Sequence, residues 1–159
     1  MFRARHEKAS HRISLPLPAE EALELFTPEG ERLWIAEWNP RYFHPANGET
    51  LEGMIFTTGE GDEKTHWTMT DFDIAGHRVR YCRVTPASRS TIVEVRCIPD
   101  GEQQCHAVVT YALTGLSDAG NAAIDAYVGD AYVAMIEDWR RKIIAHLERL
   151  PHRVFGRDV

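Results

Sequence analysis

The segment Glu37–His44 gathers side chains that can bind or react with a small molecule: Trp38, Tyr42 and His44. Trp and Tyr offer flat, rigid apolar surfaces with a polar edge, and imidazole can exchange a proton near neutral pH. Two interpretations remain open. These residues contact a ligand at the mouth of a cavity, or the aromatic rings close one end of the fold while His44 bonds to backbone.

Arg83 is the second candidate, because it alternates with Tyr81 in a strand-like run and is therefore predicted to point inward. An unpaired buried charge is costly, so an inward Arg83 needs a partner. That partner could be a ligand carboxylate or phosphate, or an internal acid such as Asp71 or Glu37. The alternative is an arginine at a strand end, with its stem packed on Tyr81 and its head in solvent.

Other candidate motifs lack the spacing or the flanking residues that their chemistry requires. The eight histidines are scattered, without a Cys-x-x-Cys or His-Glu-x-x-His spacing, so no metal is expected. The segment 115–120 resembles a nucleophile elbow, but Ala119 replaces its second glycine, so Ser117 is assigned to a loop before a helix. The glycine-containing segment 59–63 is not a phosphate-binding loop, because its acidic residues would repel phosphate. We therefore assign no catalytic residue and no cofactor.

Composition narrows the partners. The chain has 159 residues, a size typical of one domain, and a net charge of −6, which argues against nucleic acid and anionic membranes. Residues 1–10 lack the apolar core of a signal peptide, and no stretch approaches the ~20 apolar residues of a membrane span. The odd number of cysteines, three, predicts reduced thiols and a cytoplasmic protein.

One long helix is predicted from Asn121 to Leu150, with Asn121 as its N-cap and Pro151 ending it. The apolar face of its first half mixes small and amphipathic residues, so it is expected to border a cavity through residues such as Val128, Tyr132 and Met135. Its second half, with Trp139, is bulkier and is expected to be buried core. An ordinary core helix without a cavity is the alternative, and a coiled coil is disfavoured because no seven-residue repeat is sustained.

The rest of the chain predicts a sheet with two short helices. Alternation from His11 to Leu17 predicts a strand, and Pro18–Phe26 and a segment capped by Thr27 predict helices. A loop, Arg41–Thr50, follows. Five strand-like runs come next, joined by short turns that make neighbours antiparallel: Glu52–Thr58, Lys64–Asp73, Arg78–Thr85, Thr91–Ile98 and Gln104–Leu116.

Alternation also predicts which strand residues point inward. They are Met54, Phe56, Trp67, Met69, Tyr81, Arg83, Val93, Val95, Cys97, Cys105, Ala107, Val109, Tyr111 and Leu113. A tight turn at 99–101, with Gly101 in the left-handed conformation, would pair Val95 with Cys105 and leave the sulfurs of Cys97 and Cys105 offset.

The chain resembles the START-like, or SRPBCC, superfamily, which includes the birch-pollen allergen and bacterial polyketide cyclase/dehydrase-like proteins. The resemblance covers about residues 10–150 and is closest to uncharacterised bacterial members. It is carried by the segments 15–22, 26–34, 53–56, 65–67, 81–86 and 110–114. It implies an α+β helix-grip fold, in which a curved antiparallel sheet wraps around a long C-terminal helix over an interior cavity.

The expected organisation is one domain, 10–150, with tails at 1–9 and 151–159. The expected function is binding of a small apolar or amphipathic molecule between sheet and helix. The alternatives are a cyclase- or hydratase-type enzyme using His44, Tyr81, Tyr111 or Arg83, and a protein-interaction module with a filled interior; a homodimer is possible. The predicted ligand-binding residues are Trp38, Tyr42, His44, Phe56, Trp67, Met69, Tyr81, Arg83, Val95, Val109, Tyr111, Val128, Tyr132 and Met135.

Overall fold

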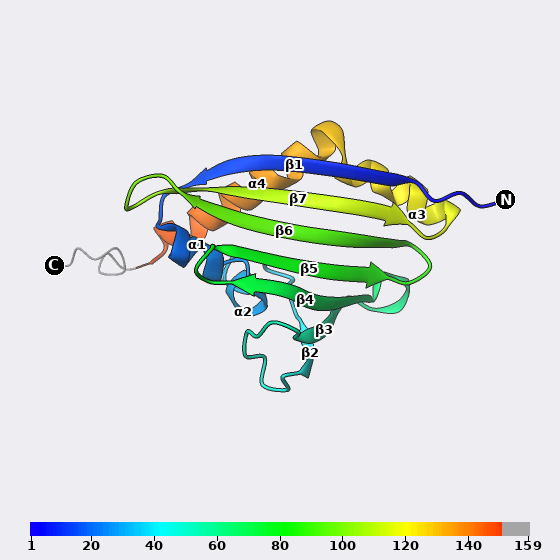
Figure 1. Cartoon of the computed structure of the whole chain (residues 1–159), viewed down its shortest axis with the longest axis horizontal. Helices are drawn as coiled ribbons and strands as arrows, with labels where there is room; N and C mark the ends of the chain where they lie inside the picture. The colour runs from blue at the N-terminus through cyan, green and yellow to red at the C-terminus, as the bar shows by residue number, and fades with distance from the viewer. Residues whose placement is uncertain (151–159) are drawn as a thin grey trace.

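A seven-stranded antiparallel sheet, in the order β1-β7-β6-β5-β4-β3-β2, forms the framework of the protein (Figure 1). The computed structural model describes residues 1–150, so the predicted tail 151–159 and the predicted helix end at Pro151 lie outside the described residues. The strands are β1 (His6–Leu15), β2 (Arg41–His44), β3 (Ile55–Thr58), β4 (Thr65–Asp73), β5 (Arg78–Thr85), β6 (Arg89–Pro99) and β7 (Cys105–Gly115).

The helices gather on one face of the curved sheet, and α4 crosses behind it (Figure 1). In chain order they are α1 (Ala19–Glu24), α2 (Pro28–Glu31), the 3-10 turn η1 (Gly61–Glu63), α3 (Asp118–Ala123), the 3-10 turn η2 (Ile124–Tyr127) and α4 (Gly129–Glu148). Thr27 caps α2 as predicted, since its hydroxyl accepts a hydrogen bond from the Gly30 amide. The predicted helix-grip architecture is confirmed.

Two boundaries differ from the predictions. Strand β1 begins at His6, where it pairs with Thr114, so residues 6–9 of the expected tail 1–9 belong to the sheet. The expected loop Arg41–Thr50 begins with the edge strand β2, which pairs with β3. Both are edge strands of the sheet. β1 pairs with β7, which is far along the chain, and β2 has only four residues, too few for a clear alternation.

The single helix predicted over Asn121–Leu150 is wrong. Val128 is extended and Gly129 has φ +59, so α4 is separated from α3 and η2. Glycine adopts this left-handed conformation without steric cost, which makes it a natural stop between two helical segments. Ser117, not Asn121, caps α3, while the Asn121 side chain accepts a hydrogen bond from the Arg5 amide at 2.9 Å.

The predicted pairing of Val95 with Cys105 is also wrong. Val95 lies opposite Val109, and Pro99 lies opposite Cys105, because the connection between β6 and β7 is longer than the turn predicted at 99–101. Gly101 does have a positive φ, +85. The register error is an even number of residues, so the inward face is unchanged. The three cysteines are free thiols.

The predicted inward residues form the core beneath the helices. All of them are buried except Arg83, which is half-buried. Ile136, Ile143 and Leu147 of α4 and Phe26 after α1 complete this core. Within residues 1–150, no helix combines the length and apolar character needed to cross a membrane.

Candidate functional site

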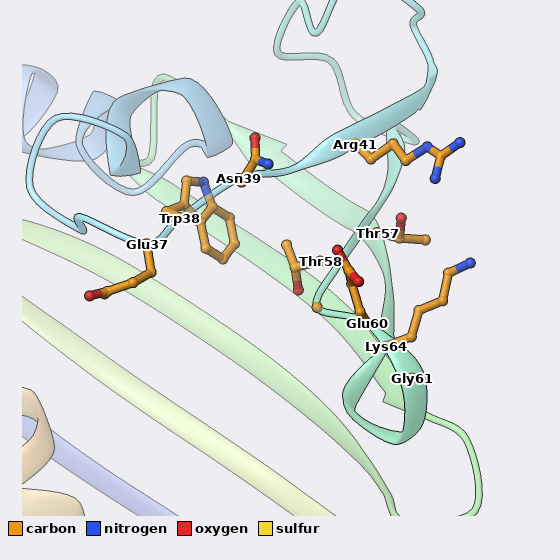
Figure 2. Close-up of a pocket in the computed structure, with 10 residues that line it drawn as sticks. Glu37, Trp38, Asn39, Arg41, Thr57, Thr58, Glu60, Gly61 and Lys64 are labelled. Atoms are coloured by element: carbon orange, nitrogen blue, oxygen red, sulfur yellow. The ribbon is translucent and has the colours of Figure 1, made fainter.

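Two hollows adjoin the same end of the sheet. The inner cavity, of about 220 Å³, lies between the sheet and the helices and is lined by Glu31, Ile35, Trp38, Trp67, Tyr81, Arg83, Val93, Val95, Tyr111, Tyr127, Met135 and Trp139. The outer cleft, of about 750 Å³, is lined by Glu37, Trp38, Asn39, Arg41, Thr57, Thr58, Gly59, Glu60, Gly61 and Lys64 (Figure 2). Trp38 borders both hollows.

The inner cavity has a sheet wall and a helix wall. Strands β4 to β7 supply Trp67, Arg83 and Tyr111, and α4 supplies Met135 and Trp139. The aromatic rings of the wall pack edge to face, as their quadrupoles favour: Trp38 against Trp67 at 5.5 Å between centroids, and Trp67 against Tyr81 at 5.5 Å. Behind the wall, Trp34 of the core packs against Trp139 at 5.7 Å. The wall is therefore rigid and largely aromatic.

Arg83 is the positive group of the inner cavity. Its guanidinium carbon lies 5.0 Å from the Tyr111 ring centroid, 5.2 Å from that of Trp67 and 5.8 Å from that of Tyr127. Its Nη2 atom is buried and has no hydrogen-bond partner among the described residues. The inward orientation predicted for Arg83 is correct, but within the described part of the chain neither proposed internal acid pairs with it. Asp71 instead accepts from Arg78 at 2.6 Å, and Glu37 lines the outer cleft.

Glu31, at the end of α2, is the acidic group of the same cavity. Burial raises the pKa of its carboxyl well above the ordinary value of 4.5, and the nearby positive charge of Arg83 only partly opposes this. Within residues 1–150, Glu31 and Arg83 form no ion pair. The cavity thus combines a fixed positive charge with a carboxyl that retains its proton more readily than usual.

Three tyrosines border the cavity, and their hydroxyls have different environments. The Tyr81 hydroxyl donates to the Phe26 carbonyl at 2.6 Å, so it is engaged in the core. The Tyr127 hydroxyl accepts from Nη2 of Arg89 at 3.2 Å. Burial raises the pKa of Tyr111, while Arg83 acts in the opposite direction. Tyr111 and Tyr127 are the tyrosines whose rings lie within about 6 Å of the Arg83 guanidinium among the described residues.

The outer cleft is larger and more open. Figure 2 shows Glu37 and Trp38 on one side of it, with Arg41 and Lys64 on the opposite side. Its charged residues, Glu37, Arg41, Glu60 and Lys64, are all exposed. Water satisfies exposed charges, so these residues need no ligand. Nη2 of Arg83, by contrast, is buried without a partner in the described part of the chain. We take the inner cavity as the candidate site.

The structure brings half of the predicted ligand-binding residues to the cavity and leaves the other half elsewhere. Those that line it are Trp38, Trp67, Tyr81, Arg83, Val95, Tyr111 and Met135. Those that do not are Tyr42, His44, Phe56, Met69, Val109, Val128 and Tyr132. The buried Phe56, Met69, Val109 and Tyr132 belong to the packed core, and the Tyr132 hydroxyl donates to the Val109 carbonyl at 2.6 Å.

Tyr42, His44 and Val128 are away from the cavity for local reasons. The Tyr42 ring packs on Phe56, and its hydroxyl donates to Glu29, which lowers the pKa of that carboxyl. His44 is exposed. Tyr42 therefore helps to close one end of the fold, the alternative considered for this segment. Val128 lies in the extended break before α4, where the predicted continuous helix would have placed it differently.

The prediction missed Glu31, Ile35, Val93, Tyr127 and Trp139 as cavity residues. Glu31 lies in the segment that was predicted as the second short helix. Its spacing of three and four residues from Trp34 and Ile35 was the available signal, since such positions share a helix face. Trp139, predicted as buried core, is half-buried and borders the cavity instead.

Comparisons with known proteins bear on the fold. No protein-family model matches the sequence, and no curated protein matches it significantly. Among solved structures, norcoclaurine synthase from Thalictrum flavum, in complex with dopamine and hydroxybenzaldehyde, has a TM-score of 0.64 at 10% identity, covering 93% of this chain and 90% of that chain.

Two bacterial structures are similarly close. The Zhui aromatase/cyclase from Streptomyces sp. R1128 has a TM-score of 0.64 at 16% identity, covering 94% of this chain and 96% of that chain. An uncharacterised protein from Rhizobium leguminosarum has a TM-score of 0.63 at 15% identity, covering 94% and 100%. At these identities the likeness concerns the fold, and this chain has the START-like helix-grip fold predicted from its sequence.

Proposed function

We propose that this protein binds a small amphipathic molecule, with a single-ring apolar body, in the inner cavity. The observation that carries the proposal is the combination of an aromatic wall with Arg83, whose buried Nη2 has no hydrogen-bond partner among the described residues. Ligand sites are typically apolar hollows with a few convergent polar groups. A ligand oxygen would complete the hydrogen bonding of Arg83.

The size of the cavity limits the ligand. Its volume of about 220 Å³ is below the ~300–1,000 Å³ of sites for drug-sized molecules, so one ring with a short polar arm is the expected size. The norcoclaurine synthase structure, of the same fold, holds dopamine and hydroxybenzaldehyde, which are single-ring molecules. A protein-interaction module with a filled interior is disfavoured because the interior contains this cavity.

Isothermal titration calorimetry with cinnamyl alcohol, a neutral single-ring probe, tests this proposal. Val93→Phe should fill the cavity and weaken binding at least about tenfold, since Val93 lines it. Ile92→Phe is the matched control, because the neighbouring Ile92 is 39% exposed and faces away from the cavity. Equal binding by the parent and Val93→Phe, or no binding by the parent, would count against the cavity as the site.

A second candidate function is proton transfer next to a carbonyl, and the position of Glu31 in the same cavity supports it. A carboxyl with a raised pKa gives a stronger base when ionised, closer to the pKa that suits general base catalysis. In this reaction the Glu31 carboxylate would remove an α-proton from a ketone. The Arg83 guanidinium would hydrogen-bond to the enolate oxygen that forms.

Exchange of the α-protons of phenylacetone in D₂O, followed by proton NMR, tests this second function. The parent should accelerate the exchange, and Glu31→Gln should remove the acceleration because an amide cannot accept the proton. Glu37→Gln is the control, since Glu37 is exposed in the outer cleft. An exchange rate equal to that of buffer would exclude this chemistry for the probe while leaving binding intact.

A further inference from the structure

Arg83 lines the inner cavity, and the sheet next to it carries further polar groups that the described protein does not satisfy. The buried side-chain atoms without a hydrogen-bond partner among residues 1–150 are Nη2 of Arg83, Nε of Arg89 and Oγ1 of Thr91. Native proteins leave few such atoms, and a local group of them calls for an explanation. All three can donate a hydrogen bond.

The strand register places these three residues together. Arg83 on β5 lies directly opposite Thr91 on β6. Arg89 precedes Thr91 by two positions on β6, so its side chain leaves the same face of the sheet. Thr91 is 1% exposed, and the Arg89 side chain is 11% exposed. The unsatisfied donors therefore belong to one buried corner of the sheet.

Tyr127 of η2 covers this corner. Its ring centroid lies 5.8 Å from the guanidinium carbon of Arg83 and 5.2 Å from that of Arg89, so two cations share one ring. The acid nearest to Arg89 is Glu63, at 4.0 Å, and its side chain is 75% exposed. The acid facing Arg83 is Glu31, whose carboxyl has a raised pKa and forms no ion pair with Arg83 within the described residues. The two guanidinium groups therefore leave an excess of positive charge in a region of low dielectric.

We propose that this corner, formed by Arg83, Arg89, Thr91 and Tyr127, is a subsite for the carboxylate group of the ligand. This inference rests on the proposed function and narrows its ligand to a single-ring carboxylic acid. The planar guanidinium matches a carboxylate in geometry and forms charge-assisted hydrogen bonds with it. The Thr91 hydroxyl supplies an additional donor, and the ring of the acid packs against the aromatic wall.

Calorimetric titration of the full chain with cinnamate and cinnamamide tests the subsite. The two probes share one ring and one side arm and differ in the charge of the terminal group. Cinnamate should bind at least about tenfold more tightly, as expected for hydrogen bonds to a charged group. Arg89→Met and the isosteric Thr91→Val should each reduce this preference while retaining the affinity for cinnamamide.

Arg80→Met is the matched control, because Arg80 projects from the opposite face of β5 and pairs with Glu94 at 2.7 Å. It should leave the preference for cinnamate unchanged. If both probes bind equally to the parent, the carboxylate subsite is wrong and binding in the cavity stands. If neither probe nor cinnamyl alcohol binds, the proposed function fails as well. If the Thr91→Val and Arg89→Met variants fold and both keep the full preference for cinnamate over cinnamamide, the subsite is also wrong.

Discussion

Glu31 and Arg83 line the same cavity, and within the described residues no ion pair joins them. Burial raises the pKa of Glu31, so the folded state holds the Glu31 proton more tightly than the unfolded state does. Stability should therefore fall as the pH rises from the ordinary value of 4.5 toward the raised pKa. The direction of the pKa shift of Glu31 thus determines the sign of the pH dependence of stability.

Glu31→Gln should remove this pH dependence. Near pH 7 the variant should have a higher free energy of unfolding than the parent, because no carboxyl with a raised pKa must ionise in the cavity. At about pH 4, where Glu31 is protonated in both states, the difference should shrink. Urea denaturation at the two pH values measures it. A difference independent of pH would contradict the raised pKa of Glu31. Glu20→Gln, at an exposed site, should change stability by less than ~0.5 kcal/mol.

Arg83→Met should not lower stability. The variant loses contacts to three aromatic rings, worth up to ~2 kcal/mol. It also removes a partly buried charge whose Nη2 has no hydrogen-bond partner among the described residues, and the burial of such a charge costs several kcal/mol. The free energy of unfolding should equal or exceed that of the parent, while binding of cinnamate is lost.

Arg78→Met provides the comparison for Arg83→Met. Arg78 pairs with Asp71 at 2.6 Å in a half-exposed ion pair, so its removal should cost up to ~1 kcal/mol. A loss of more than ~2 kcal/mol in Arg83→Met would show that Arg83 is a structural residue whose partners are already in place.

Met135→Trp should be tolerated because Met135 borders the cavity and the larger side chain has space to enter it. A change in the free energy of unfolding within about 1 kcal/mol is expected. The adjacent Ile136→Trp should destabilise by ~1–3 kcal/mol or more, since Ile136 is 0% exposed and its surroundings are packed. Equal destabilisation by both variants, measured by thermal unfolding, would indicate that the space is not available.

Gly129→Ala should destabilise the protein by ~1–2 kcal/mol, the cost of a left-handed conformation for a residue with a Cβ. The φ of Gly129 is +59, and an added Cβ would meet no atom within 4 Å, so backbone strain is the only cost. Gly129→Asn should lose less, because Asn tolerates this conformation. Stability of the alanine variant equal to that of the parent would contradict the break before α4.

Most of the sheet could be predicted because the side chains of a strand alternate between its two faces, with a period of two residues. The inward set was correct even though the β6–β7 pairing was wrong, since an even register error leaves each side chain on its own face. The broken helix could not be predicted from apolar spacing alone. The apolar spacing continues from Ile124 to Met135 across the break, and only Gly129 marks the break in the sequence.

The residues of the candidate site also fall into two groups, those that could be predicted from the sequence and those that could not. Trp67, Tyr81, Arg83 and Tyr111 were predictable because alternation determines the face of a strand residue. Glu31 and Tyr127 were not, because their positions depend on how α2 and η2 pack against the sheet. That packing is a tertiary property, which local periodicity does not encode.

Tryptophan side-chain NMR during a titration with cinnamate tests the central claim most directly. Trp38, Trp67 and Trp139 line the cavity, whereas Trp34 is buried in the core with its indole nitrogen donating to the Leu25 carbonyl. The indole signals of the first three should shift saturably, with a smaller change at Trp34, and Val93→Phe should abolish the shifts. If these signals do not respond, or respond equally in Val93→Phe, the ligand site is not in this cavity.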